Sequence, residues 1–532
     1  MTRTKTLIVG GVLLMALQAC GGGMTAQSGQ LKPEHRSGKK DSKGNQVSKE
    51  AAANFDTALA GFLEHDKKQD WAEASCTEVA KNFEDAASTQ KSQANRAFPE
   101  ALYNAGLAYQ RCGKDDQARE KFEAASAAEA GFHRARAQIA LYDYSKSNDI
   151  DGTISKLDTV IRDAKFQNAE ALVSLAALQV ERDSDQSDGD GKDDLERAQK
   201  NLQRALAVDD TYMPAFNQLA VYYLEQAKKK AGAREAKTRR GKRGMEVSGA
   251  KRAEVNEQQL DLAALVASQA QRKNPNYAPI HNTTGLIQVE LKNFNGAVKS
   301  FARARQLDPK FFEAHMNYAA VNLSFRGYGE AEKAYRDALK LRPKDYEAYL
   351  GLALALRGQI NDNNFEASVT EAQKYLEEAK KTDSSRAETY YNEAILTHEF
   401  RAKRAGDKAI PLLRKAAQQY SDFVGKASDD PAFAQAVKRS KDRVQDIEDT
   451  IKFMEEGEKS RKEEEAAMKE AEAIKKQEEA AKKAEEEAAK KAAAAAPPPA
   501  DPKAAPPAGD KPADPKAAPG PAKPDAKPAP KK

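Results

Sequence analysis

The six histidines are the first candidates for metal or acid–base chemistry in this 532-residue chain, and they are scattered. His281 and His315 are 34 residues apart, so a repeat of that length would place them at the same position of adjacent units. They could then share a metal, or pack as ordinary helix side chains. The sequence contains no phosphate-binding glycine loop, HExxH, CxxC or nucleophile elbow. We therefore expect no enzymatic activity, no cofactor and no resident metal.

An acidic insertion at residues 183–194 carries six aspartates and one lysine. Oxygen ligands at alternate positions around glycines resemble a calcium-binding loop. Gly189 lies one position later than an EF-hand loop starting at Asp183 requires, and no glutamate occupies the twelfth position. Both a calcium loop and a solvated acidic loop remain open.

The N-terminus has the layout of an export signal. Arg3 and Lys5 precede an apolar run that ends at Leu17. Eleven apolar residues span about 16 Å as a helix, which is half of a bilayer core. We therefore interpret residues 1–19 as a signal peptide.

The residues that follow indicate a lipid anchor. Ala19-Cys20 resembles the lipobox of bacterial lipoproteins, which implies lipidation of Cys20, although Gln18 departs from the usual small residue. Secretion without lipid is the alternative. Gly21, rather than aspartate, follows the cysteine, and by the same resemblance this implies an outer-membrane anchor facing the periplasm. Polar residues 20–47 are expected to form a flexible tether.

A basic insertion at residues 228–252 carries eleven Lys and Arg against two glutamates. It has no interleaved aromatic residues, and the export signal places it away from nucleic acid. The expected partners are anionic lipid, cell-wall polymer or an acidic protein.

Cys76 and Cys112 are the remaining cysteines, and export would place them in an oxidising compartment. Cys76 is expected early in one helix and Cys112 at the end of the next. Antiparallel neighbours bring such ends together, so a disulfide or two small buried thiols would both fit.

The elements that position these residues follow a 34-residue period. Six positions of one unit recur in the next as small, aromatic, leucine or proline residues: Gly285, Ala297, Phe301, Ala304, Leu307 and Pro309 recur as Ala319, Ala331, Tyr335, Ala338, Leu341 and Pro343. Small residues let two helices approach closely, aromatic residues fill the gaps, and proline ends the second helix.

This period and spacing resemble the tetratricopeptide repeat. The resemblance implies an all-α superhelical solenoid of about eight to nine helix pairs over residues 48–420, rather than an ordinary helical bundle. A chain with 31% charged and 7% aromatic residues suits such thin apolar seams.

The same resemblance implies a peptide-binding concave face formed by the first helix of each pair. In peptide-binding relatives, one position of that helix contacts the ligand backbone, and amides suit it because they donate and accept at once. Here the position holds amides in five units: Asn104, Gln138, Gln218, Asn317 and Asn392. Tyr103, Tyr391 and Leu354 would add apolar contacts. Alternatively, the amides only solvate the surface.

Beyond the repeats, three segments are expected. Residues 421–456 carry an apolar stripe for a capping helix, or for a coiled coil with another chain: Phe433, Val437, Val444, Ile447, Ile451 and Met454. Residues 457–492 form a charged Glu/Lys/Ala helix. Residues 493–532 are rich in Pro, Ala and Lys and are expected to be disordered, as an envelope spacer or a solubility tail.

The overall layout resembles the tetratricopeptide lipoproteins of myxobacterial adventurous gliding motility. That resemblance implies a non-enzymatic scaffold that holds other envelope proteins in a motility complex. An adapter for peptidoglycan enzymes, or a pilotin for an outer-membrane secretion or pilus pore, is the alternative. A carbohydrate- or peptidoglycan-processing enzyme is a third possibility, for which the sequence offers no set of catalytic residues.

Overall fold

The computed structural model describes residues 31–494, except 37–39, 42, 69, 188–189 and 242–255. In these ranges the chain is helical and has no β-strand; an isolated bridge joins Lys40 and Gln46. The predicted all-α class is therefore confirmed. The chain divides into a unit ending at Ile451 and a second unit beginning at Lys452. The signal peptide and Cys20 lie outside the described residues.

None of the described helices is both long and apolar enough to cross a membrane.

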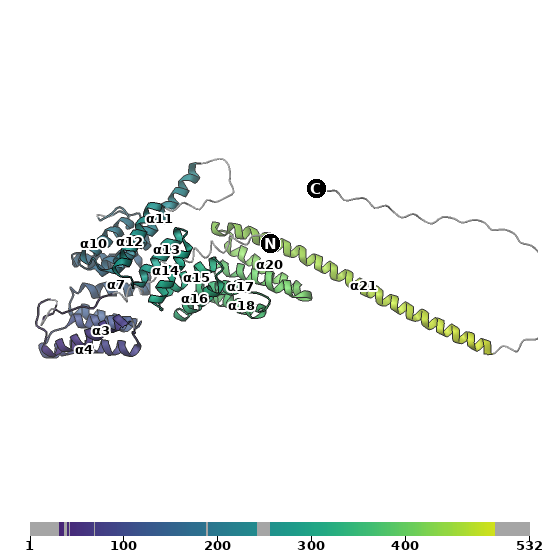
Figure 1. Ribbon diagram of the computed structural model, residues 1–532, viewed down its shortest axis with the longest axis horizontal. Helices are drawn as coiled ribbons and strands as arrows, with labels where there is room; N and C mark the ends of the chain where they lie inside the picture. Colours follow the sequence, from purple (N-terminus) through teal and green to yellow (C-terminus); the bar gives the residue numbers. More distant parts are fainter. Residues whose placement is uncertain are drawn as a thin grey trace, which may run out of the picture. The chain divides into compact units, whose positions relative to one another are not determined.

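Helices of the first unit follow one another as antiparallel pairs (Figure 1). Over the described residues 49–241 and 256–427 there are nine pairs: α3 (Lys49–Lys68) with α4 (Glu73–Ala94), α5 (Pro99–Arg111) with α6 (Asp115–Ala128), α7 (His133–Ser147) with α8 (Ile150–Asp163), α9 (Ala169–Arg182) with α10 (Asp194–Val208), α11 (Met213–Gly241) with α12 (Glu257–Lys273), α13 (Ala278–Glu290) with α14 (Phe294–Leu307), α15 (Phe312–Ser324) with α16 (Tyr328–Leu341), α17 (Tyr346–Gly358) with α18 (Phe365–Thr382), and α19 (Ala387–Ile395) with α20 (Ala409–Ala427). We call the first helix of each pair A and the second B. The predicted solenoid is confirmed.

Small residues face aromatic rings at the contacts between these helices. A Cβ added to Gly285 would lie 2.4 Å from the Phe301 ring, and one added to Gly351 would lie 2.2 Å from the Tyr335 ring. Phe301 and Tyr335 are fully buried. The helix backbones therefore approach closely because no side chain separates them.

The last A helix ends irregularly. After Ile395 the chain continues as a π-helix (Leu396–Arg401) and two short 3₁₀ turns (Ala402–Arg404 and Gly406–Lys408) before α20. Thr397 and His398 within this π-helix are largely buried.

The C-terminal boundaries differ from the prediction. Residues 421–427 belong to α20, because Tyr420, Phe423 and Ala427 are buried and extend its apolar stripe. A 3₁₀ turn (Pro431–Phe433) follows, with Asp430 accepting a hydrogen bond from the Ala432 amide.

One helix, α21 (Ala434–Ala494), then includes both the expected capping helix and the expected charged helix. In the first unit, Ile447 and Ile451 of this helix are buried, and Arg443 donates a hydrogen bond to the Tyr420 hydroxyl of the last repeat. Nothing at the expected break at residue 456 disrupts the helix, since Gly457 alone costs only about 1 kcal/mol.

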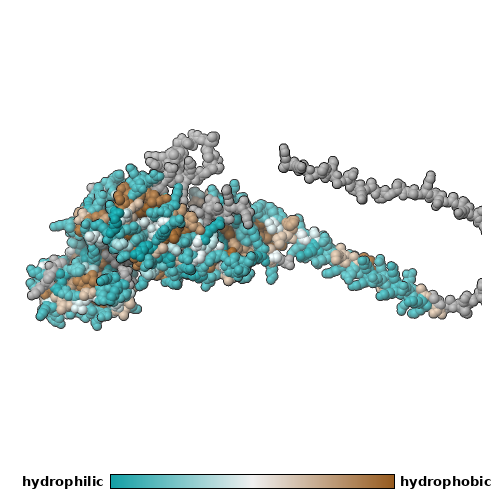
Figure 2. Space-filling model, viewed as in Figure 1, coloured by the Kyte–Doolittle hydropathy of each residue, from teal (hydrophilic) through white to brown (hydrophobic). Residues whose placement is uncertain are grey.

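The described part of the second unit is exposed and hydrophilic over the surface shown in Figure 2. Its ion pairs at helical spacing include Lys476 Nζ to Glu472 Oε1 at 2.9 Å. The expected disordered tail lies outside the described residues, apart from positions 493 and 494 at the end of α21.

Candidate peptide-binding face

A segment of the chain itself lies on the A helices. Residues 31–36, with the sequence Leu-Lys-Pro-Glu-His-Arg, have no regular secondary structure and contact α5, α7 and α9. Leu31 and Pro33 are buried, whereas Lys32 is exposed between them. Such alternation is typical of extended chain. We call residues 31–36 the N-terminal segment.

Asn104 of α5 recognises the main chain of this segment. Its Oδ1 accepts from the Glu34 amide at 2.7 Å, and its Nδ2 donates to the Glu34 carbonyl at 3.0 Å. One side chain therefore satisfies both backbone groups of one residue, independently of that residue's identity.

Two arginines donate to the carbonyls that precede this contact. Arg111 Nη2 bonds the Leu31 carbonyl at 2.8 Å, and Arg134 bonds the Lys32 carbonyl. Arg111 is held by two hydrogen bonds to Asp66 and lies over the Phe62 ring. Both partners fix the guanidinium in one orientation, so its donors are pre-positioned.

Arg134 is held in a similar way. It pairs with Glu170 through its Nε at 2.9 Å and lies 4.7 Å from the centre of the Tyr103 ring. Burial lowers the pKa of Arg134, but the Glu170 and Glu34 carboxylates outweigh it and raise that pKa. The guanidinium therefore stays charged and also binds Glu34 Oε1 at 2.8 Å.

The Lys32 side chain reaches a separate acidic position. Its Nζ lies 2.7 Å from Asp209 Oδ2 and 6.0 Å from the centre of the Tyr212 ring. Burial raises the pKa of Asp209, but hydrogen bonds from Lys32 and Thr211 outweigh it and lower the pKa to about 2. Lys32 and Glu34 thus meet opposite charges two residues apart.

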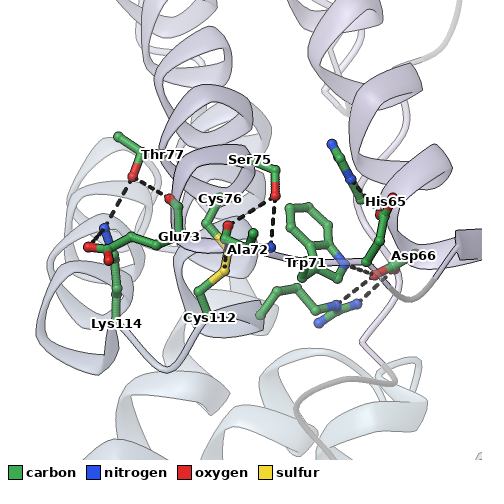
Figure 3. The surroundings of a disulfide bond; sticks show 12 residues. His65, Asp66, Trp71, Ala72, Glu73, Ser75, Cys76, Thr77, Cys112 and Lys114 are labelled. Carbon is green, nitrogen blue, oxygen red and sulfur yellow. Dashed lines mark hydrogen bonds and ion pairs between the residues drawn. A yellow bond between two sulfur atoms is a disulfide. The ribbon is translucent and has the colours of Figure 1, made fainter. Parts of the chain in front are cut away.

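A disulfide fixes the end of the helix that carries Arg111. Cys76, early in α4, is bonded to Cys112, the residue directly after α5 (Figure 3). Of the two alternatives for these cysteines, the structure has the disulfide. Figure 3 also shows Trp71 pointing at Asp66, where its Nε1 donates at 2.7 Å to the carboxylate that holds Arg111.

The five amides expected on an open surface are nearly buried instead. Their exposed fractions are 0% for Asn104, 4% for Gln138, 9% for Gln218, 1% for Asn317 and 9% for Asn392. Neither a row of open peptide contacts nor mere solvation describes them, because the N-terminal segment covers Asn104, and Gln138, Asn317 and Asn392 bond side chains of neighbouring A helices.

Several of these amides bond to neighbouring A helices. Asn317 Nδ2 donates to Asn282 Oδ1 at 2.9 Å, and Arg357 donates to Asn392 Oδ1 at 2.7 Å. Gln138 Oε1 accepts from Gln110 at 3.4 Å. Among the five, Asn104 bonds the N-terminal segment.

The three expected apolar anchors also differ in exposure. Tyr103 is fully buried between Phe122 and Phe132, so it supports Arg134 and does not form an open surface. Tyr391 and Leu354 are half-buried. Tyr391 packs against the Tyr420 and Phe423 rings.

The acidic insertion is paired with arginines in its described part. Asp194 receives Arg182 and Arg197 at 2.7 and 2.6 Å, and Asp190 receives Arg204 at 2.8 Å. Burial raises the pKa of Asp194, but these hydrogen bonds outweigh it and lower the pKa to about 2. Guanidinium groups therefore occupy carboxylate oxygens of Asp190 and Asp194.

Among the residues that the structure describes, no cluster of three His, Cys, Asp or Glu side chains could hold a metal. His281 and His315 each bond a proline carbonyl six residues earlier, Pro275 at 2.8 Å and Pro309 at 2.9 Å. They close repeat loops and do not meet at a shared site.

The basic insertion is described only up to Gly241, where it continues α11. Residues 242–252 of the insertion lie outside the described residues.

Sequence reasoning missed the N-terminal segment and the two arginines. It assigned residues 20–47 to a flexible tether, but the structure places 31–36 on the A helices, and Gln90 bonds both the Ser48 amide and the Gln46 carbonyl. The available signal was Leu31 and Pro33 within an otherwise polar stretch.

The sequence matches no protein-family model and no curated protein sequence. Among solved structures, it is similar to a tetratricopeptide protein of Thermus thermophilus, with 22% identity, 42% of this chain and 99% of that chain covered, and a TM-score of 0.33. It is similar to yeast Tom70, with 16% identity, coverage of 80% and 76%, and a TM-score of 0.41. It is also similar to PilF of Pseudomonas aeruginosa, with 18% identity, coverage of 48% and 92%, and a TM-score of 0.33.

These likenesses are too distant to indicate a function. The fold is defined by the chain's own helix pairs, with small and aromatic residues at their contacts and a 34-residue period. By these features the described chain has the fold of a tetratricopeptide-repeat solenoid.

Proposed function

We propose that this protein is a scaffold that binds extended segments of other proteins on its A helices, and that it acts by contact without catalysis. The observation that carries the proposal is the pair of hydrogen bonds between Asn104 and the main chain of Glu34. A side chain that reads backbone groups in one extended segment can read them in another.

We further propose that the scaffold is anchored by lipid at Cys20 to the outer membrane and faces the periplasm. The charged N-terminus, the apolar run and the lipobox-like Ala19-Cys20 support this location. The Cys76–Cys112 disulfide supports it independently, because structural disulfides persist mainly in oxidising compartments.

The complex proposed for this scaffold is a multiprotein envelope machine, such as a gliding-motility machine. Support comes from the layout of lipobox, repeats, charged helix and Pro/Ala/Lys-rich tail. The alternative is an adapter for peptidoglycan enzymes or a pilotin for an outer-membrane pore. Residues 228–252 would add contacts with anionic lipid or cell-wall polymer, and no nucleic acid is involved.

Site-specific cross-linking in the native envelope tests the proposal. A photo-reactive amino acid replaces half-buried Leu354 on the A helix α17, and exposed Lys374 on the B helix α18 serves as the matched control. We expect Leu354 to capture envelope proteins that Lys374 does not. Motility proteins, peptidoglycan enzymes or pore subunits among them would decide between the alternatives. Equal capture at both positions, or turnover of cell-wall substrates by the purified chain, would contradict the scaffold role.

A further inference from the structure

The N-terminal segment occupies the place of a ligand. Asn104 is fully buried beneath it, and its six residues reach from Asp209 to Asp56, which pairs with Arg36. Resting on the proposed function, we propose that the segment is an internal copy of the ligand. The site then takes a partner peptide with an apolar residue, lysine, proline and glutamate in succession, and such a peptide binds by displacing residues 31–36.

The main-chain contacts define the shape of that peptide. Arg111, Arg134 and Asn104 bond the carbonyls of three residues, Leu31, Lys32 and Glu34. Asn104 and Glu170 also accept from the amides of Glu34 and Lys32, the latter at 3.4 Å. A helical ligand would use these groups internally, so the site selects an extended chain.

The side-chain contacts define its charges. Lys32 is placed at Asp209, and Glu34 at Arg134. A peptide with these two charges exchanged would put carboxylate on carboxylate and ammonium on guanidinium, and such like-charge pairs discriminate strongly between partners.

The apolar contacts define the remaining two positions. Leu31 joins the buried cluster of the first repeats, and Pro33 is buried. Proline restricts the free peptide to extended conformations, which reduces the entropy lost on binding. Proline has no N–H, and none of the described main-chain contacts of the segment requires one at position 33.

The internal copy competes because it is covalently attached. Attachment through a few residues gives an effective concentration in the millimolar range, so a free peptide binds the intact chain more weakly than the bare site. The ion pair of Lys32 is largely exposed, with 59% of the lysine side chain accessible, which keeps the segment displaceable.

Peptide titration of the purified full-length chain tests this inference. The probe is a fluorescent peptide with the sequence of residues 29–37, measured by anisotropy against the wild type and K32E/E34K. The double variant carries an internal segment with mismatched charges, so we expect it to bind the probe at least tenfold more tightly. The matched control H35A changes an exposed neighbour and is expected to behave like the wild type.

Two further arms identify the site. Adding N104D to K32E/E34K removes the donor to the peptide carbonyl, and we expect the gained affinity to be lost while circular dichroism stays helical. A probe with its lysine and glutamate exchanged is expected to bind the wild-type chain no better than background.

Equal affinity for the wild type and K32E/E34K would overturn the inference, and so would retention of binding by N104D or tight binding of the exchanged probe. Any of these results leaves partner capture at Leu354 unaffected, because α17 lies outside the described contacts of residues 31–36. The failure of this inference is therefore distinguishable from the failure of the scaffold function.

Discussion

At the scale of single residues, one A-helix side chain in several repeats hydrogen-bonds to the loop that precedes its helix. The side chain there donates to a carbonyl six residues earlier in four repeats: His281 to Pro275, His315 to Pro309, Tyr349 to Pro343 and Tyr390 to Ser384. Histidine and tyrosine are interchangeable at this position because each offers a donor at the end of a flat ring.

His315 makes this contact dependent on pH. Burial and the nearby Arg305, whose Nε donates to its Nδ1 at 2.9 Å, lower the pKa of His315. The unfolded chain therefore takes up the proton more readily than the folded chain. Its contribution to stability is complete above the unfolded pKa of about 6.5 and falls as the pH drops below that value. We expect H315Q, which keeps a donor and an acceptor, to lose less melting temperature than the wild type between pH 7.5 and 5.5.

The matched control for that comparison is H281Q, at the same repeat position but without an arginine on the ring nitrogen. In thermal melts at both pH values, H281Q should lose as much melting temperature as the wild type. If H315Q loses as much melting temperature as the wild type between pH 7.5 and 5.5, His315 is not the source of the pH dependence.

Glycine contacts give a second prediction at this scale. G351A places a methyl group 2.2 Å from the buried Tyr335 ring, and overpacking of this kind costs about 1–3 kcal/mol. Gly425 in α20 has no atom within 4 Å of an added Cβ, so G425A is expected to stabilise by up to about 1 kcal/mol. Urea denaturation midpoints should move in opposite directions. The packing account fails if both variants move the same way.

From the sequence, the packing residues could be placed correctly, but the exposure of the amides could not. Gly285, Phe301 and their counterparts were placed correctly because spacing alone decides which helix faces meet. The amides were expected to be exposed, and they are buried, because exposure depends on the segment that covers Asn104 and, for the others, on how closely adjacent A helices pack. That distance follows from side chains of neighbouring repeats and not from the amide position itself.

At the scale of elements, the disulfide ties α4 to the end of α5 and so places Arg111 beneath the N-terminal segment. Closing a loop with a sequence separation of 36 removes about 4 kcal/mol of unfolded-chain entropy. We expect reduction to lower the urea midpoint and to speed amide exchange at residues 31–36. C76A/C112A treated with the same reductant should show no further change, which separates the bond from the reagent.

The predicted helix boundaries were wrong at residues 421 and 456. Asp430 caps the 3₁₀ turn that directly precedes α21. The boundary at residue 421 was wrong because Phe423 and Ala427 extend α20. The boundary at residue 456 was wrong because loss of the apolar stripe changes what a helix packs on, not whether it remains helical.

At the scale of the whole chain, the repeat architecture could be predicted because 34-residue periodicity repeats one local solution along the sequence. The docking of residues 31–36 could not. Its contacts join residues as far apart as Lys32 and Asp209, and a six-residue segment without periodicity carries no signal for such a pairing.

The central claim is that the A helices bind an extended chain segment and that residues 31–36 now occupy them. Amide hydrogen exchange of Glu34, whose N–H donates to Asn104, tests this most directly. In the intact protein we predict exchange at least tenfold slower than in an unfolded peptide, and loss of that protection in N104A, which removes the accepting oxygen. Exchange of Glu34 at the unfolded rate in the wild type would contradict the account.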